Sequence, residues 1–153
     1  MHKHDARLFV YTGALAIVAG GLLSAFSAHN PSFVTSWSAA YLVLVVGAFQ
    51  VVVGLAIYSF VKGRHSMCDI YWSFGLFNLG NFAVISGTVL KHTFKTPNLL
   101  IALGGLFIVI VMVLFVRLIP RGTKNKYLVV YYLLIAFVAA SVAVGLALSA
   151  RNL

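Results

Sequence analysis

Acidic side chains are almost absent from this sequence. Asp and Glu number two in 153 residues, and 8% of all residues are charged, against about 25% in an average soluble domain. The two carboxylates, Asp5 and Asp69, are far apart in the chain. Catalysis that needs paired carboxylates, or an acid and a base acting together, therefore lacks its groups. We expect that the protein is not an enzyme.

Residues that hold metals or haem are also scarce. Cys68 is the one cysteine, which excludes an intramolecular disulfide and a cysteine metal cluster. The five His lie in the N-terminal tail or in connections, whereas a membrane b-type haem takes its axial His from within helices. His65, Cys68 and Asp69 are close in sequence, and we interpret them as interfacial polar residues before an apolar segment. We expect no metal and no cofactor.

Long apolar segments are what the sequence has in abundance, since 62% of its residues are hydrophobic. Five segments are long and apolar enough to cross a bilayer as α-helices of about 20 residues. They are Leu8–Phe26, Ala39–Val61, Ile70–Leu90, Leu99–Ile119 and Tyr127–Ser149. Short connections rich in Pro, Gly, Asn and Lys separate them. The sequence predicts an all-α integral membrane protein, with residues 1–153 forming one bundle of five transmembrane helices.

Basic residues outnumber acidic ones by eleven to two, which can indicate nucleic-acid binding, but their distribution indicates topology instead. Eight fall on the side of the N-terminus and three on the other: Lys3, Arg7, Lys62, Arg64, Arg117, Arg121, Lys124 and Lys126, against Lys91, Lys95 and Arg151. The positive-inside rule then predicts a cytoplasmic N-terminus and an external C-terminus. We expect a multi-pass protein of a prokaryotic cytoplasmic membrane, in contact with lipid and not with nucleic acid.

The first segment has a basic flank and small residues after it, as a secretory signal has. Its apolar core is longer than the 7–15 residues typical of a signal peptide. We therefore interpret it as a permanent span.

Carboxamides lie in the middle of two predicted spans. Gly47, Gln50 and Gly54 share one face of the 39–61 segment, and the glycines there allow another backbone to approach closely. Phe74, Asn78 and Asn81 share one face of the 70–90 segment. These two spans are antiparallel neighbours in sequence, so we expect Gln50 and Asn78 to meet. The amides either lock helices together or line a path for a solute.

The 39–61 and 70–90 spans resemble the acetate uptake transporter family, the succinate–acetate permeases. The similar stretches are "GAFQVVVGLAIY" at 47–58 and "GRHSMCDIYWSFG" at 63–75. The resemblance implies a homo-oligomer with a narrow path in each protomer for small monocarboxylates or succinate. It also implies a constriction of aromatic and aliphatic side chains, to which Phe74 corresponds, with Ile135 as the aliphatic counterpart.

The sequence also departs from that family. The Asn-Pro-Ala-Pro-Leu-Gly-Leu motif before the first span is absent. The position of the family's first-span aromatic falls near Gly13–Ala14, where this sequence has no aromatic residue. The family also has six spans, whereas this sequence predicts five. Two functions therefore stay open. The first is a small transporter or channel for a small monocarboxylate or similar solute, with a path formed by Gln50, Phe74, Asn78, Asn81 and Ile135. The alternative is an accessory structural subunit of a larger membrane complex.

Overall fold

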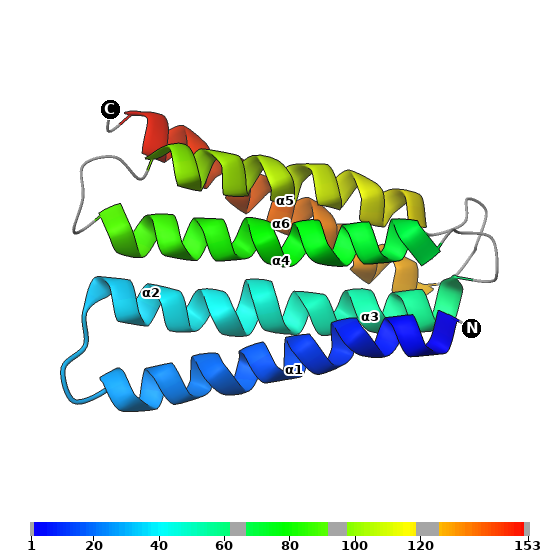
Figure 1. The fold of residues 1–153 in the computed structure, drawn as a ribbon, viewed down its shortest axis with the longest axis horizontal. Coiled ribbons are helices and arrows are strands. Elements are labelled where there is room, and N and C mark those ends of the chain that lie inside the picture. Colours follow the sequence, from blue (N-terminus) through cyan, green and yellow to red (C-terminus); the bar gives the residue numbers. More distant parts are fainter. Residues whose placement is uncertain (1, 62–66, 92–97, 119–125, 152–153) are drawn as a thin grey trace. The chain divides into compact units, whose positions relative to one another are not determined.

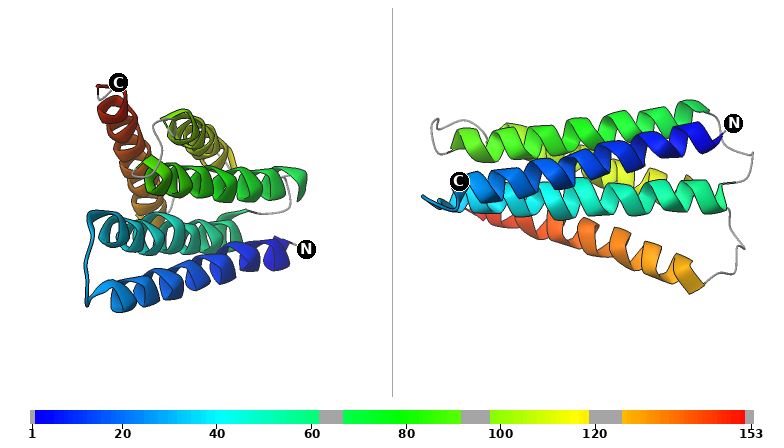
Figure 2. Two further views of the ribbon diagram at one scale, coloured as in Figure 1. Left: turned by 60° about the vertical axis from the view of Figure 1, so that its left-hand side comes forward. Right: turned by 90° about the horizontal axis from the view of Figure 1, so that it is seen from below.

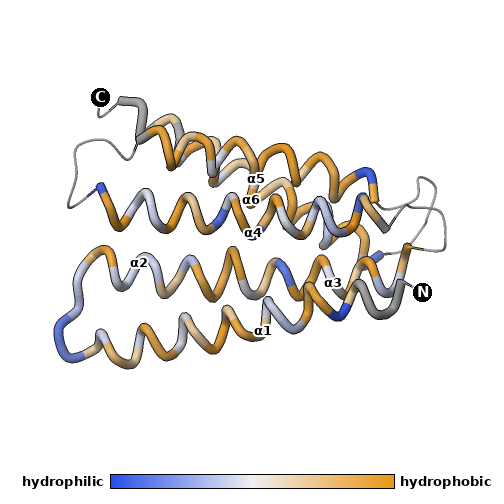
Figure 3. Tube along the Cα trace, in the orientation of Figure 1, coloured by the Kyte–Doolittle hydropathy of each residue, from blue (hydrophilic) through white to orange (hydrophobic). Residues whose placement is uncertain are grey.

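The computed structural model describes residues 2–61, 67–91, 98–118 and 126–151, and this part of the chain contains helices and no strands (Figure 1). Four spans are single helices: α1 (His2–Ser27), α4 (Met67–Lys91), α5 (Asn98–Leu118) and α6 (Lys126–Arg151). The remaining span consists of α2 (Phe33–Tyr41), the π-helix η1 (Leu42–Ala48) and α3 (Phe49–Phe60). Five spans are long and apolar enough to cross a membrane, and hydrophobic residues predominate along them in Figure 3. The predicted all-helical architecture with five such spans is confirmed.

The second span begins at Phe33, whereas the hydropathy pattern predicted a start at Ala39. A capping box causes the earlier start. The Thr35 backbone N–H donates to Ser32 Oγ at 3.1 Å, and the Ser32 backbone N–H donates to Thr35 Oγ1 at 3.1 Å. These two bonds satisfy donors that the first turn of a helix leaves unpaired, so the helix forms before the strongly apolar residues start.

The chain divides into two compact units. The first contains α1 and the span formed by α2, η1 and α3, and the second contains α4 from Cys68, α5 and α6. Within the first unit, α1 lies beside the second span and antiparallel to it in every view (Figure 2). That the whole chain forms one domain stays a prediction.

Small residues bring the two spans of the first unit into backbone contact. We call these residues the small-residue seam: Ala6, Gly13 and Gly20 on α1, facing Gly54, Gly47 and Ala39 on the second span. A Cβ placed on Gly13 would lie 2.8 Å from the Gly47 carbonyl oxygen, and one on Gly47 would lie 3.1 Å from that of Gly13. Glycine at these positions permits close helix packing, as small residues do in membrane proteins. The predicted approach of another backbone to Gly47 and Gly54 is confirmed.

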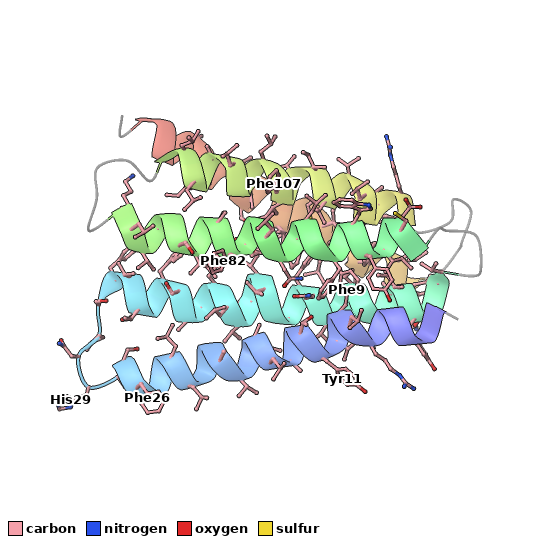
Figure 4. The ribbon with its side chains drawn as sticks, viewed as in Figure 1. Phe9, Tyr11, Phe26, His29, Phe82 and Phe107 are labelled. Atoms are coloured by element: carbon pink, nitrogen blue, oxygen red, sulfur yellow. The ribbon has the colours of Figure 1, made fainter. Side chains whose placement is uncertain are left out.

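Side chains of α1 divide according to this seam (Figure 4). Phe9 is fully buried, and its Cβ lies beside Gly54. Tyr11 and Phe26 point away from the second span and are 62% and 82% exposed. The outer face of α1 is therefore apolar and exposed, while its inner face packs on the second span.

The π-helix adjusts the register of the seam. On α1 the seam residues recur every seven positions, but on the second span Ala39 and Gly47 are eight apart. A π-turn takes up about one residue more than an α-turn. The extra residue within η1 therefore aligns Ala39, which is buried, with Gly20, while Ala40 is exposed.

The second unit repeats this kind of contact between α4 and α5. A Cβ on Gly104 would lie 2.7 Å from the Gly80 carbonyl oxygen, and one on Gly80 would lie 3.0 Å from that of Gly104. The rings of Phe77 and Phe115 pack with their centroids 5.8 Å apart. On α6, the buried Tyr131 hydroxyl donates to the Phe115 carbonyl oxygen at 3.0 Å, which joins α6 to α5.

Candidate functional site

Among the described residues of the first unit, Gln50 is the most deeply enclosed polar side chain, with 0% of its surface exposed. It lies on α3, one turn after Gly47, where the seam brings α1 into close backbone contact. Its Nε2 donates to Thr12 Oγ1 on α1 at 2.8 Å. Thr12 Oγ1 in turn donates to the Leu8 carbonyl oxygen at 2.6 Å. A relay of two hydrogen bonds therefore runs from the carboxamide to the backbone of α1.

The other end of the same carboxamide has no partner. Gln50 Oε1 is buried, and no donor among the described residues reaches it. A buried acceptor without a hydrogen bond costs on the order of 1–3 kcal/mol. An unsatisfied atom of this kind calls for an explanation, such as a bound molecule or a functional role.

Asn78 and Asn81 satisfy their donors on their own helix, α4. Asn78 Nδ2 donates to the Phe74 carbonyl oxygen at 2.8 Å, and Asn81 Nδ2 donates to that of Phe77 at 2.8 Å. Asn81 is buried and Asn78 is half-buried. Local bonds of this kind give the NH₂ group of a carboxamide an acceptor within an apolar helix.

The predicted path residues divide between the two units. Phe74, Asn78 and Asn81 share one face of α4, as predicted, because the helix continues without a break from Met67 to Lys91. Ile135 is buried on α6 in the same unit, and Phe74 is half-buried. Gln50 belongs to the first unit. Its contact with Asn78, and a path shared by all five residues, stay predictions.

Thr12 is the site residue that sequence reasoning missed. The first span is predominantly apolar, and hydropathy does not distinguish the Thr12 hydroxyl from those of Tyr11 and Ser24. The signal was present in the dipeptide Thr12–Gly13, since a hydroxyl beside a glycine lies where a second helix can approach. The glycine on the partner helix, Gly47, precedes Gln50 by three residues, which puts the amide on the same face.

A hollow of about 570 Å³ opens elsewhere in the first unit, around the end of α1 and the beginning of the second span. Its lining is small and rich in hydroxyls, and includes Gly20, Gly21, Ser24, Ser27, Ser36 and Ala39. The predicted path residues do not line this hollow. The hollow lies at the end of the small-residue seam, beside the connection between α1 and α2, and Gln50 does not line it.

Metal-ligating side chains do not gather within the part of the chain that the structure describes, where no group of three or more His, Cys, Asp or Glu forms a site. Cys68 is exposed at the start of α4. His65, the neighbour of Cys68 and Asp69 in sequence, lies outside the described residues.

The fold and the site together define a helical protein with five candidate membrane spans and buried carboxamides near the middle of two of them. Comparisons with protein families, with characterised proteins and with solved structures find no match to this chain.

Proposed function

We propose that this chain is a multi-pass protein of a prokaryotic cytoplasmic membrane and acts as a small transporter or channel for a small monocarboxylate or a similar solute. The observation that carries the proposal is the buried, unpaired Oε1 of Gln50. Polar groups inside a membrane often mark a solute path, and an unsatisfied one is especially costly where lipid supplies no donor. The resemblance of the second and third spans to acetate uptake transporters supports the same function and a homo-oligomeric state.

The accessory-subunit function is the second candidate, and the hydrogen bonds of Asn78 and Asn81 favour it. Both side chains are anchored on their own helix, and Gln50 joins two helices through Thr12. Side chains bonded in this way can serve packing alone. In that case the protein joins a larger membrane complex and passes no solute.

Phe74→Ala separates the two functions. If Phe74 narrows the path, its truncation widens the path, and uptake of labelled acetate into proteoliposomes rises while the protein still assembles. If Phe74 is packed core, truncation leaves a cavity that costs about 3–5 kcal/mol, and thermal stability falls without a gain in uptake. Phe82→Ala is the matched control, since Phe82 lies on the same helix and is 70% exposed.

Wild-type uptake above that of protein-free vesicles, with a further change in Phe74→Ala and none in Phe82→Ala, supports the transporter. Asn78→Leu is expected to reduce uptake because it removes a polar partner for water or solute. Absence of wild-type acetate uptake at about pH 5, where part of the acetate is undissociated, together with a large fall in the melting temperature of Phe74→Ala, supports the accessory subunit.

A further inference from the structure

Hydrogen-bond geometry fixes which end of the Gln50 carboxamide is free. Thr12 Oγ1 has one proton, and it lies 2.6 Å from the Leu8 carbonyl oxygen and 3.3 Å from that of Phe9. Those carbonyls can only accept, so the Thr12 proton is committed to them. Thr12 Oγ1 must then accept from Gln50, and the NH₂ group of the amide must face Thr12. The free end is the carbonyl oxygen.

Asn78 and Asn81, like Gln50, use the nitrogen of the amide to donate a hydrogen bond to the protein. Each side chain lies 2.8 Å from a backbone carbonyl oxygen of α4, and only an N–H can donate to that oxygen. The nitrogen of each amide therefore faces the protein. All three carboxamides of the predicted path thus have their NH₂ group anchored within hydrogen-bond distance of a protein oxygen.

Within residues 8–61, the two spans that hold Gln50 and its partner Thr12 offer no positive side chain to receive an anion. Residues 8–61, which include α1 from Leu8 and the whole second span, have no Lys, Arg, Asp or Glu. A carboxylate only accepts hydrogen bonds, and so does Gln50 Oε1, so the two cannot form a hydrogen bond with each other. Burying such a charge without a counter-charge is far more costly than burying a neutral polar group.

We propose that the Gln50 oxygen recognises the solute through a hydrogen-bond donor that the solute carries. The solute class is a small neutral molecule with an O–H or N–H, such as an undissociated carboxylic acid or a primary amide, and the carboxylate anion is disfavoured. This inference rests on the proposed transport function and specifies the form in which the solute passes. Thr12 is the positioning residue, because it turns the oxygen of the amide toward the solute.

Paired flux measurements on the wild-type protein in proteoliposomes test this. Acetamide serves as the neutral donor-bearing probe, and its entry is followed by light scattering in a stopped-flow instrument. Acetate serves as the anionic probe at about pH 8, far above the pKa of a carboxyl group, with uptake driven by a K⁺ gradient and valinomycin. We expect acetamide entry well above that of protein-free vesicles and no electrogenic acetate uptake above them.

Variants connect the flux to the amide. Gln50→Leu is expected to slow acetamide entry about tenfold, the size of one lost hydrogen bond in a dry site. Thr12→Val keeps Gln50 but lets its amide turn, so the preference for acetamide over acetate is expected to fall. Thr88→Val is the control, since Thr88 Oγ1 donates only to the carbonyl oxygen of Val84 on its own helix, at 2.8 Å. Gel filtration confirms that each variant assembles.

Each failure has its own meaning. Acetate uptake without acetamide entry, or equal entry of both, overturns the inference and leaves the transport function standing. Acetamide entry that Gln50→Leu does not change also overturns the inference. Entry of neither probe refutes the transport function, and the inference falls with it.

Discussion

Single hydroxyl groups link neighbouring helices at two places in the described residues. Thr12 links the amide of Gln50 to the backbone of α1, and Tyr131 links α6 to the carbonyl oxygen of Phe115. Each acts between helices. Thr88, in contrast, donates to its own helix at Val84. The difference between these two kinds of bond is measurable by removing one hydroxyl at a time.

Thr12→Val is expected to lower the free energy of unfolding by about 1–3 kcal/mol, because Gln50 Nε2 stays buried and loses its acceptor. Thr88→Val removes a bond within one helix and is expected to cost less. Thermal unfolding of both variants in the same detergent provides the measurement. Equal losses for the two variants would show that the bond from Gln50 to Thr12 does not contribute to stability.

Tyr131→Phe is expected to cost about 1 kcal/mol, the usual net value of one intramolecular hydrogen bond. The ring stays in place, so only the bond to the Phe115 carbonyl oxygen is lost. Tyr132→Phe is the adjacent control, since this side chain is 38% exposed, and its melting temperature is expected to match the wild type. A larger loss in Tyr132→Phe would contradict this assignment.

Pairs of helices in both units are joined by one recurring contact. In the first unit, Gly13 faces Gly47 and Val51, and in the second, Gly104 faces Gly80 and Val84. Each glycine meets a glycine of its partner and the β-branched residue four positions later. The reverse contacts, of Gly47 with Ile17 and of Gly80 with Ile108, follow the same rule.

Gly13→Ala tests this contact. Its Cβ would lie 2.8 Å from a backbone oxygen, which cannot move without shifting a helix, so we expect a loss of about 1–3 kcal/mol. Gly21→Ala is the control on the same helix, where no atom lies within 4 Å of the added Cβ. Its stability is expected to be unchanged, or higher by up to about 1 kcal/mol through helix propensity. Equal stabilities of the two variants would argue against close packing at Gly13.

Hydropathy predicted the existence and the number of the spans because five long apolar runs have few other solutions. It predicted the start of the second span poorly, since the capping box at Ser32 and Thr35 lies outside the strongly apolar run. The π-turn left no signal, because it depends on how Ala39 fits against α1 and not on composition. The partners of the carboxamides were missed for a similar reason: a side chain can bond the backbone four residues back, and no periodicity reveals it.

At the scale of the whole molecule, charge distribution predicts the orientation in the membrane. Eight basic residues fall on the predicted inner side and three on the outer side. A reporter fused after Leu153 is expected to be active outside the cytoplasm, and one inserted at residues 120–126 is expected to be active inside. The opposite pattern would refute the predicted topology, and with it the resemblance to the acetate transporters.

The π-helix of the second span also determines which changes in chain length the protein can tolerate. Deleting Val45 removes the extra residue, and Ala39 then stands seven positions before Gly47, so that a regular α-helix keeps both residues on one face, two turns apart. The residue that meets Gly20 is therefore still Ala39, so the small-residue seam is unchanged. Deleting Val52 instead moves Gly54 out of line with Ala6. We expect gel filtration to show a folded protein after the first deletion and an aggregate after the second. In evolution, residues 42–48 can therefore lose or gain one residue, whereas residues 49–60 cannot.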